Sequence, residues 1–107
     1  MESILNTERG ICFVCGRIGR THLHHIFYGQ KQHKIADKEG LTVYLCPECH
    51  EGTNGVHGKN GAKLNFTLKE IAQEAWEAKY KESYPYMNHA EEAAREAFIR
   101  MMGKNYL

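Results

Sequence analysis

The chain has 107 residues, a formal net charge of +1, 42% hydrophobic residues and 25% charged residues. This composition is that of an ordinary soluble protein, and the length predicts a single domain over residues 1–107. No apolar run approaches the roughly 18 residues that span a bilayer, which excludes a membrane-spanning helix. The first ten residues, MESILNTERG, lack the basic stretch and apolar core of a secretory signal. We therefore expect a cytoplasmic protein that has no membrane partner.

The first motif along the chain is CFVC, with Cys12 and Cys15, and it is matched by CPEC, with Cys46 and Cys49. Two C-x-x-C pairs separated by thirty residues have the spacing of a tetrahedral zinc site. Free thiols or a redox pair are the alternatives, but a redox site would need only one pair, on a thioredoxin-like pattern that is absent. Four protein ligands leave no open position for water, so the spacing predicts a structural zinc.

Two short runs of strand-forming residues, LHHIFYG and LTVYLC, lie between the cysteine pairs and predict a hairpin. His24 and His25 lie on its first strand, and His50 follows Cys49 directly. If the second pair opens a short helix, His50 points away from the zinc and toward the hairpin, so the zinc brings these histidines together. His22 alternates with His24 along the strand, and we interpret it as a surface or packing residue rather than a ligand.

The first third of the chain is basic. Between residues 9 and 38 it carries six Lys and Arg side chains against Asp37 alone, whereas residues 64–107 carry six basic and seven acidic side chains. A polyanion would be drawn to the basic third, although a solvated loop has the same composition. His33 fits a solvated face as well as a phosphate contact. The candidates for DNA phosphate contacts are Arg17, Arg20, Lys31 and Lys34.

Helical periodicity follows a cysteine- and histidine-rich core of about residues 9–61 and predicts a helical extension over about 64–103. Thr67 begins a capping box, TLKE, from which a helix should run to about Glu82. Asn88 can cap a second helix, with Gly103 as its stop. The apolar stripes of the two helices exceed what a small zinc core can cover. We expect the first helix to wrap the core and the second to dock with a partner.

The order of these motifs resembles a known family. A C-x-x-C knuckle, then H-H-I on a strand, then C-x-x-C-H at a helix start, over about residues 9–61, resembles the HNH, or ββα-metal, endonucleases. More narrowly, LHHIFYG, GLTVYLCPECH, GVHG followed by LKEIAQEAWE, and the closing GKNYL resemble phage-encoded, RecA-dependent nucleases of the recombination-enhancement (Ref) type. The resemblance implies an α+β fold: a treble-clef, zinc-stabilised ββα-metal core, with a short β-hairpin plus helix, followed by two C-terminal α-helices.

The resemblance also implies roles for individual residues. His24 becomes a ligand of a catalytic ion and His25 the general base, while His50 is a second ligand. Asn54 would be a further ligand, and His57 would bind the metal or contact the scissile phosphate. The asparagine that often precedes the second strand in this family is absent from the segment of Gly40, Leu41 and Thr42. The resemblance therefore assigns no residue to orient the base, and Gln32 and Asn54 are weak candidates for that role.

The chemistry of the residues is consistent with these roles. A neutral imidazole can deprotonate water near pH 7, and one divalent ion can neutralise a phosphate and hold the leaving oxygen. Few carboxylates lie near the histidines in the sequence, so a two-metal carboxylate site is not expected. Imidazoles and an amide suit Mg²⁺, Mn²⁺ or a transition ion.

We therefore expect a metal-dependent endonuclease that hydrolyses DNA phosphodiester bonds. Because no second DNA-reading domain is visible, it should have no strong sequence specificity of its own. The resemblance implies single-stranded or recombinase-coated DNA, a RecA-type recombinase as partner, and the bacterial host cell as location. Two alternatives stay open: a non-catalytic treble-clef module that binds nucleic acid or protein, and a structural protein that docks through its helices.

Overall fold

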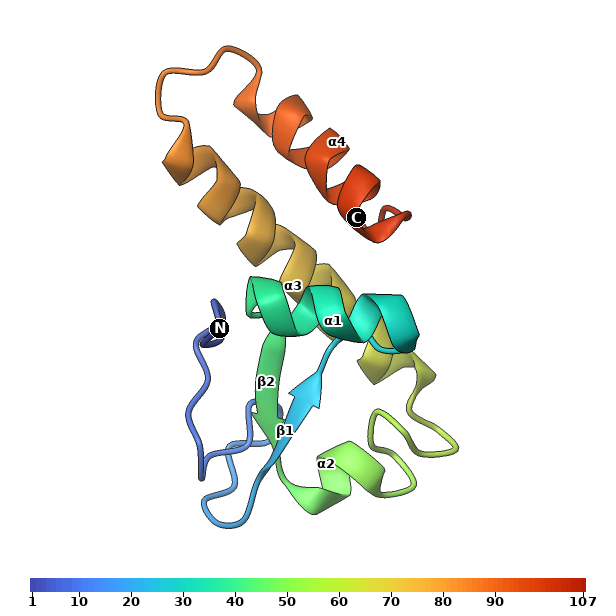
Figure 1. Cartoon of the computed structure of the whole chain (residues 1–107). Helices are drawn as coiled ribbons and strands as arrows, with labels where there is room; N and C mark the ends of the chain where they lie inside the picture. The colour runs from blue at the N-terminus through green and yellow to red at the C-terminus, as the bar shows by residue number, and fades with distance from the viewer.

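The computed structural model describes all 107 residues. Its elements are β1 (His22–His25), α1 (Gln30–Glu39), β2 (Thr42–Leu45), α2 (Pro47–Glu51), α3 (Ala62–Ser83) and α4 (Ala90–Met102). Figure 1 shows the sheet and α2 at one end and a two-helix arm of α3 and α4 at the other, over extents of 43 × 24 × 21 Å. The expected α+β class is confirmed: a two-stranded antiparallel sheet with short helices, a cluster of four cysteines, and two C-terminal helices packed together. None of the helices has the length and hydropathy needed to cross a membrane.

The sheet pairs β1 with β2, placing His24 opposite Val43 and His25 opposite Thr42. The two strands are joined by the ten-residue helix α1, which the sequence analysis did not predict. The segment shows no clear apolar periodicity in the sequence, because the face of α1 that packs against the core is small. Ala36 is fully buried and Ile35 packs partly against the core, while most of the other residues of α1 face solvent.

The two C-terminal helices lie close to their predicted ranges, but their starts differ. The helix α3 begins at Ala62, so the capping box that starts at Thr67 lies inside the helix and caps nothing. The chain already turns at Gly61, whose carbonyl accepts the N–H of Asn65. The helix α4 begins at Ala90, and Gly103 ends it with a φ of 85°, as predicted, because glycine adopts the left-handed conformation without strain.

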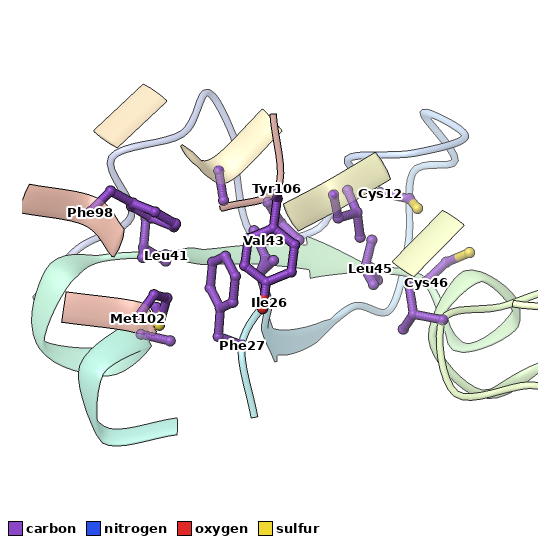
Figure 2. Close-up of a cluster of buried hydrophobic side chains, with 14 residues drawn as sticks. Cys12, Ile26, Phe27, Leu41, Val43, Leu45, Cys46, Phe98, Met102 and Tyr106 are labelled. Atoms are coloured by element: carbon purple, nitrogen blue, oxygen red, sulfur yellow. The ribbon is translucent and has the colours of Figure 1, made fainter. Parts of the chain in front are cut away.

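A continuous apolar core joins the two halves of the molecule. Figure 2 shows it running from Cys12 and Cys46 at one end to Phe98 and Met102 at the other. Phe98 of α4 is fully buried, with its ring centroid 6.0 Å from that of Phe27, the second residue after β1. The helix α4 is therefore part of the core, and the docking of a partner on it stays a prediction. The zinc-type half has too few apolar residues of its own, and α4 completes its core.

A buried polar network fixes the C-terminal tail against α3. Gln73 is fully buried; its amide nitrogen donates to Glu77 and Asn105, at 2.7 and 2.8 Å. Its carbonyl oxygen accepts the backbone N–H of Tyr106 at 2.8 Å. Arg95 of α4 donates to the same Glu77 carboxylate at 2.9 Å. Because every arm of the network is paired, the tail has one defined position beside the middle of α3.

Candidate metal centres

The four cysteines form the first centre. Their sulfur atoms all lie within 4.8 Å of one another, and the Cys15 and Cys46 sulfurs are 3.7 Å apart. A tetrahedral zinc with Zn–S bonds of about 2.3 Å requires sulfur separations of about 3.8 Å. All four are free thiols, so no disulfide competes with the metal. The cysteine centre (Cys12, Cys15, Cys46, Cys49) is therefore consistent with a structural zinc site.

The backbone around the cysteine centre already favours thiolates. The backbone N–H of Cys15 points at the Cys12 sulfur and that of Cys49 at the Cys46 sulfur, each at 3.5 Å. Burial alone would raise the pKa of the Cys12 thiol, but hydrogen bonds from the backbone of Cys15, Cys46 and Val14 outweigh it and lower the pKa to about 6. Burial and the neighbouring thiols raise the pKa of Cys49. Without a cation, the charge of one thiolate thus disfavours ionisation of the other thiols. A bound divalent cation removes this repulsion.

Three histidines form a second centre. The histidine centre (His24, His50, His57) draws one residue each from β1, α2 and the loop that follows α2. Their nitrogen donors lie within 4.8 Å of one another, and the ring centroids are 5.2 Å apart for His24–His50 and His24–His57 and 4.8 Å for His50–His57. The resemblance implied His24 and His50 as ligands and His57 as a ligand or a phosphate contact, and the structure brings the three side chains together.

His24 is the most informative member of the histidine centre. Its side chain is only 1% exposed, and its Nε2 is buried without any hydrogen-bond partner. Leaving a buried polar atom unpaired costs about 1–3 kcal/mol, so native proteins usually pair such atoms. This nitrogen lies near two other imidazoles and has no hydrogen-bond partner. Such a nitrogen is suited to binding a metal ion. Three imidazoles therefore form a donor set that can hold a divalent ion, best one of the transition series.

The electrostatics of the centre keep the imidazoles neutral. Burial, followed by the proximity of His50 and His57, lowers the pKa of His24 to about 3. Burial, then His57 and His22, lowers the pKa of His50 as well. Both residues therefore present free lone pairs at neutral pH, as ligation requires.

The loop after α2 positions His57. The backbone N–H of His57 donates to the carbonyl of His50 at 3.0 Å, so the loop folds back onto the helix. A side chain at Gly55 would meet the carbonyl oxygen of Glu48, and one at Gly58 would meet that of Gly52. The glycines that recur every three residues from 52 to 61 make this close packing possible. That spacing is the signal in the sequence that could have shown this loop to be ordered.

His22 lies against the histidine centre, although the sequence analysis treated it as a surface or packing residue. Its Nδ1 is 3.0 Å from the Nδ1 of His50, so one of the two nitrogens carries the shared hydrogen. Glu51 also approaches the His50 Nδ1, at 3.7 Å. When the Nδ1 of His50 is the donor of the hydrogen bond with His22, its Nε2 keeps a free lone pair, and such a bond orients a metal-binding histidine.

His25 projects from the other face of β1, because neighbouring residues on a strand alternate. Its Nε2 lies 3.0 Å from Oδ1 of Asp37 on α1, and its ring stacks on His33 at a centroid distance of 3.9 Å. This hydrogen bond lowers the pKa of the Asp37 carboxyl group. Asp37 is thus the residue placed to orient His25, and the sequence analysis missed it because α1 was not foreseen.

The two orienting candidates from the sequence lie elsewhere. Gln32 donates to the carbonyl of Met102 at 3.3 Å and so ties α1 to α4. Asn54, also predicted as a metal ligand, is exposed, and its side-chain oxygen accepts a hydrogen bond from Asn60 at 3.2 Å. Neither side chain contacts His25 through a hydrogen bond, and Asn54 is engaged within its own loop.

The four candidates for phosphate contacts are all exposed. Arg17 and Arg20 lie in the loop before β1, and Arg17 pairs with Glu48 at 3.8 Å. Lys31 and Lys34 lie on α1, beyond the other end of β1, where Lys34 lines an open hollow with His33. They therefore flank the strand that carries His24 rather than forming one compact patch.

Neither a protein-family model nor a curated protein nor a solved structure matches the chain. What the molecule does is therefore inferred from its two centres. One is a cluster of four cysteines suited to zinc, and the other is a cluster of histidines beside a two-stranded sheet.

Proposed function

We propose that the protein is a metal-dependent endonuclease of the HNH type, which hydrolyses DNA phosphodiester bonds. The observation that carries the proposal is the buried, unpartnered Nε2 of His24, which His50 and His57 approach from two other elements. A zinc-stabilised binding module needs the cysteine centre but has no use for a second, unsaturated set of ligands. A reaction centre does need one, because substrate must reach the ion.

In this proposal the two centres have separate tasks. Cys12, Cys15, Cys46 and Cys49 hold a structural Zn²⁺ that fixes α2 against β1. His24, His50 and His57 would hold a divalent ion, either Mg²⁺ or Mn²⁺. When bound there, the ion supplies charge neutralisation for the phosphate and stabilisation for the leaving oxygen. Asn54 would join this set only by giving up its hydrogen bond with Asn60.

His25 is proposed as the general base. Asp37 accepts a hydrogen bond from its Nε2, which leaves the lone pair on Nδ1. That lone pair can take a proton from a water molecule, and the Asp37 carboxylate then stabilises the imidazolium cation that results. An aspartate that orients a histidine and holds its tautomer has the same task in other hydrolases.

One observation favours the alternative, a non-catalytic zinc module for nucleic acid or protein. His25 projects from the face of β1 opposite to His24, and both Asp37 and His33 already contact it. If that arrangement persists when DNA is bound, the base stays away from the histidine centre. The protein would then bind without cutting.

The substrate part of the proposal rests on the resemblance and on the exposed basic residues. Arg17, Arg20, Lys31 and Lys34 would give sequence-independent, salt-sensitive contacts with the DNA backbone. Single-stranded or recombinase-coated DNA is the proposed form, with a RecA-type recombinase bringing the protein to its target.

Cleavage of supercoiled plasmid DNA in Mg²⁺ or Mn²⁺ tests the function. We expect His25→Ala to lower the rate by on the order of 10²–10⁴, which is the usual contribution of a positioned base. The matched control is His89→Ala, since His89 is exposed at the start of α4 and pairs only with Glu92. A His25→Ala protein that cuts as fast as the wild type contradicts the base assignment. A wild-type protein that never cuts, with both centres loaded, supports the non-catalytic module.

A further inference from the structure

A tyrosine links the histidine centre to α3. The ring centroid of Tyr28 lies 5.2 Å from that of His57 and 6.1 Å from that of His24. Its hydroxyl oxygen accepts a hydrogen bond from the amide of Asn65 at 3.0 Å, and the Nζ of Lys69 lies 5.3 Å from its ring centroid. Asn65 and Lys69 are four residues apart on α3, so they share one face of the helix. That face therefore forms a further side of the centre.

The buried polar atoms of the chain point to the same place. Only two side-chain nitrogen or oxygen atoms are buried without a hydrogen-bond partner, and these are Nε2 of His24 and Oδ1 of Asn65. Both residues lie next to Tyr28: the His24 ring centroid is 6.1 Å from that of Tyr28, and Asn65 donates to its hydroxyl oxygen. Because unpaired buried atoms are rare, their coincidence around one exposed aromatic ring indicates a site that the chain alone leaves incomplete.

Lys69 has an unusual environment for a lysine. Its Nζ lies 5.3–6.0 Å from the ring centroids of Phe27, Tyr28 and Tyr106, and none of the ion pairs of the chain includes it. Lys104, from the tail, lies 5.1 Å from the same Tyr106 ring. Burial, followed by the charge of Lys104, lowers the pKa of Lys69. Two ammonium groups thus share one aromatic surface with no carboxylate to neutralise them.

This arrangement favours an anion. Aromatic faces attract an ammonium group but carry no charge, so they leave the mutual repulsion of Lys69 and Lys104 in place. A bound anion would remove that repulsion, and its attraction to the ammonium group would offset the free-energy cost of desolvating Lys69. The hydroxyl of Tyr28 can assist, because its oxygen accepts from Asn65 while its own hydrogen remains free to donate.

We infer that Lys69 and Tyr28 form a phosphate-binding subsite, in which one phosphate of the nucleic-acid backbone binds next to the histidine centre. The inference rests on the proposed function, since it places a backbone phosphate beside the reaction centre. Lys69 provides the charge, Tyr28 donates a hydrogen bond from its hydroxyl group, and Asn65 holds the phenol in position. The sequence analysis assigned a role to none of these residues; it predicted a helix from Thr67 to about Glu82 and expected it to wrap the core.

Binding of a fluorescent, short single-stranded oligodeoxynucleotide, without added Mg²⁺ or Mn²⁺ and with the zinc retained, tests the subsite. Lys69→Met keeps the apolar stem of the side chain and removes only the charge. We expect it to raise Kd about tenfold and to reduce the slope of log Kd against log salt by about 0.7. Lys69→Arg should retain most of the affinity. Lys79→Met, on the exposed far part of the same helix, is the control for loss of one charge.

The outcomes separate this inference from the proposed function. The subsite is overturned if Lys69→Met and Lys79→Met bind the oligodeoxynucleotide with the same Kd and the same salt slope, both with full zinc content. A large loss of DNA affinity in Lys69→Arg also counts against the subsite. The positive charge is kept in that variant, so the loss would come from the changed shape of the side chain. Neither result depends on cleavage. Plasmid DNA that stays intact with the wild type, together with the expected Lys69→Met defect, would reject the nuclease and keep the phosphate subsite.

Discussion

The cysteine centre and the histidine centre share one short helix, α2, in which Cys49 and His50 are neighbours, yet they are built differently. The cysteines come in two pairs, and within each pair a backbone N–H bonds the partner sulfur, so each half forms locally. The histidines come from β1, α2 and a glycine-rich loop, and one of their nitrogens has no partner. Four donors can fill a tetrahedral coordination shell, whereas a set of three leaves a position open. Stability and reactivity should therefore respond to different substitutions.

The sharpest contrast is in stability. Cys12→Ser should unfold the protein, because Cys12 is 2% exposed within the core and a structural zinc contributes about 10 kcal/mol or more. That contribution matches the whole stability of a typical domain, about 5–15 kcal/mol. Zinc content and thermal melting followed by circular dichroism would measure this. His57→Ala, which removes one exposed member of the histidine centre, should melt close to the wild type. A zinc-free Cys12→Ser protein with a cooperative, wild-type melt would refute the structural role.

The pH dependence of stability should report on His24. In the folded protein without a divalent ion at the histidine centre, its pKa is about 3, against 6.5 in the unfolded chain. As the pH falls below 6.5, His24 takes up a proton in the unfolded state but not in the folded state, so the free energy of unfolding decreases. The loss should approach about 1.4 kcal/mol per pH unit and continue until the folded pKa is reached. Above pH 6.5 this contribution is fully present.

Urea unfolding at a series of pH values between about 6.5 and 5 measures that slope. The control is His24→Leu, which fills a similar volume and removes the titrating group while leaving the cysteine centre intact. Its slope should be shallower, and at neutral pH it should be about as stable as the wild type, since an unpaired polar group is replaced. Equal slopes in the two proteins would show that His24 titrates normally.

The smallest expected effect concerns His22. His22→Ala removes the partner of the His50 Nδ1, and loss of such an orienting hydrogen bond lowers metal affinity about tenfold. Titration with Mn²⁺, followed by electron paramagnetic resonance, measures it, with His33→Ala as the control on α1. Unchanged affinity in His22→Ala would mean that His22 only packs against the centre, as the sequence analysis held.

The sequence predicted correctly those features that depend on residues close together in the chain. The two C-x-x-C pairs, the strands and the helix stop at Gly103 all follow from residues within a few positions of one another. Errors arose where the local signal was weak or competed with another. The helix α3 begins after the turn at Gly61 instead of at the capping box of Thr67, and α1 was missed because its buried face is little more than Ala36 and Ile35.

The sequence by itself determined the class of the fold, the cysteine centre and the convergence of His24 and His50, because cysteine pairs that share one metal draw their neighbours together. Only the tertiary structure decided the partners of each side chain. It placed Asp37 beside His25, His22 beside His50, and Lys69 beside Tyr28. These pairs join residues 12 to 41 positions apart. Such contacts depend on how a strand alternates, how helices pack on its two faces, and where the C-terminal tail is fixed, and no local pattern carries that information.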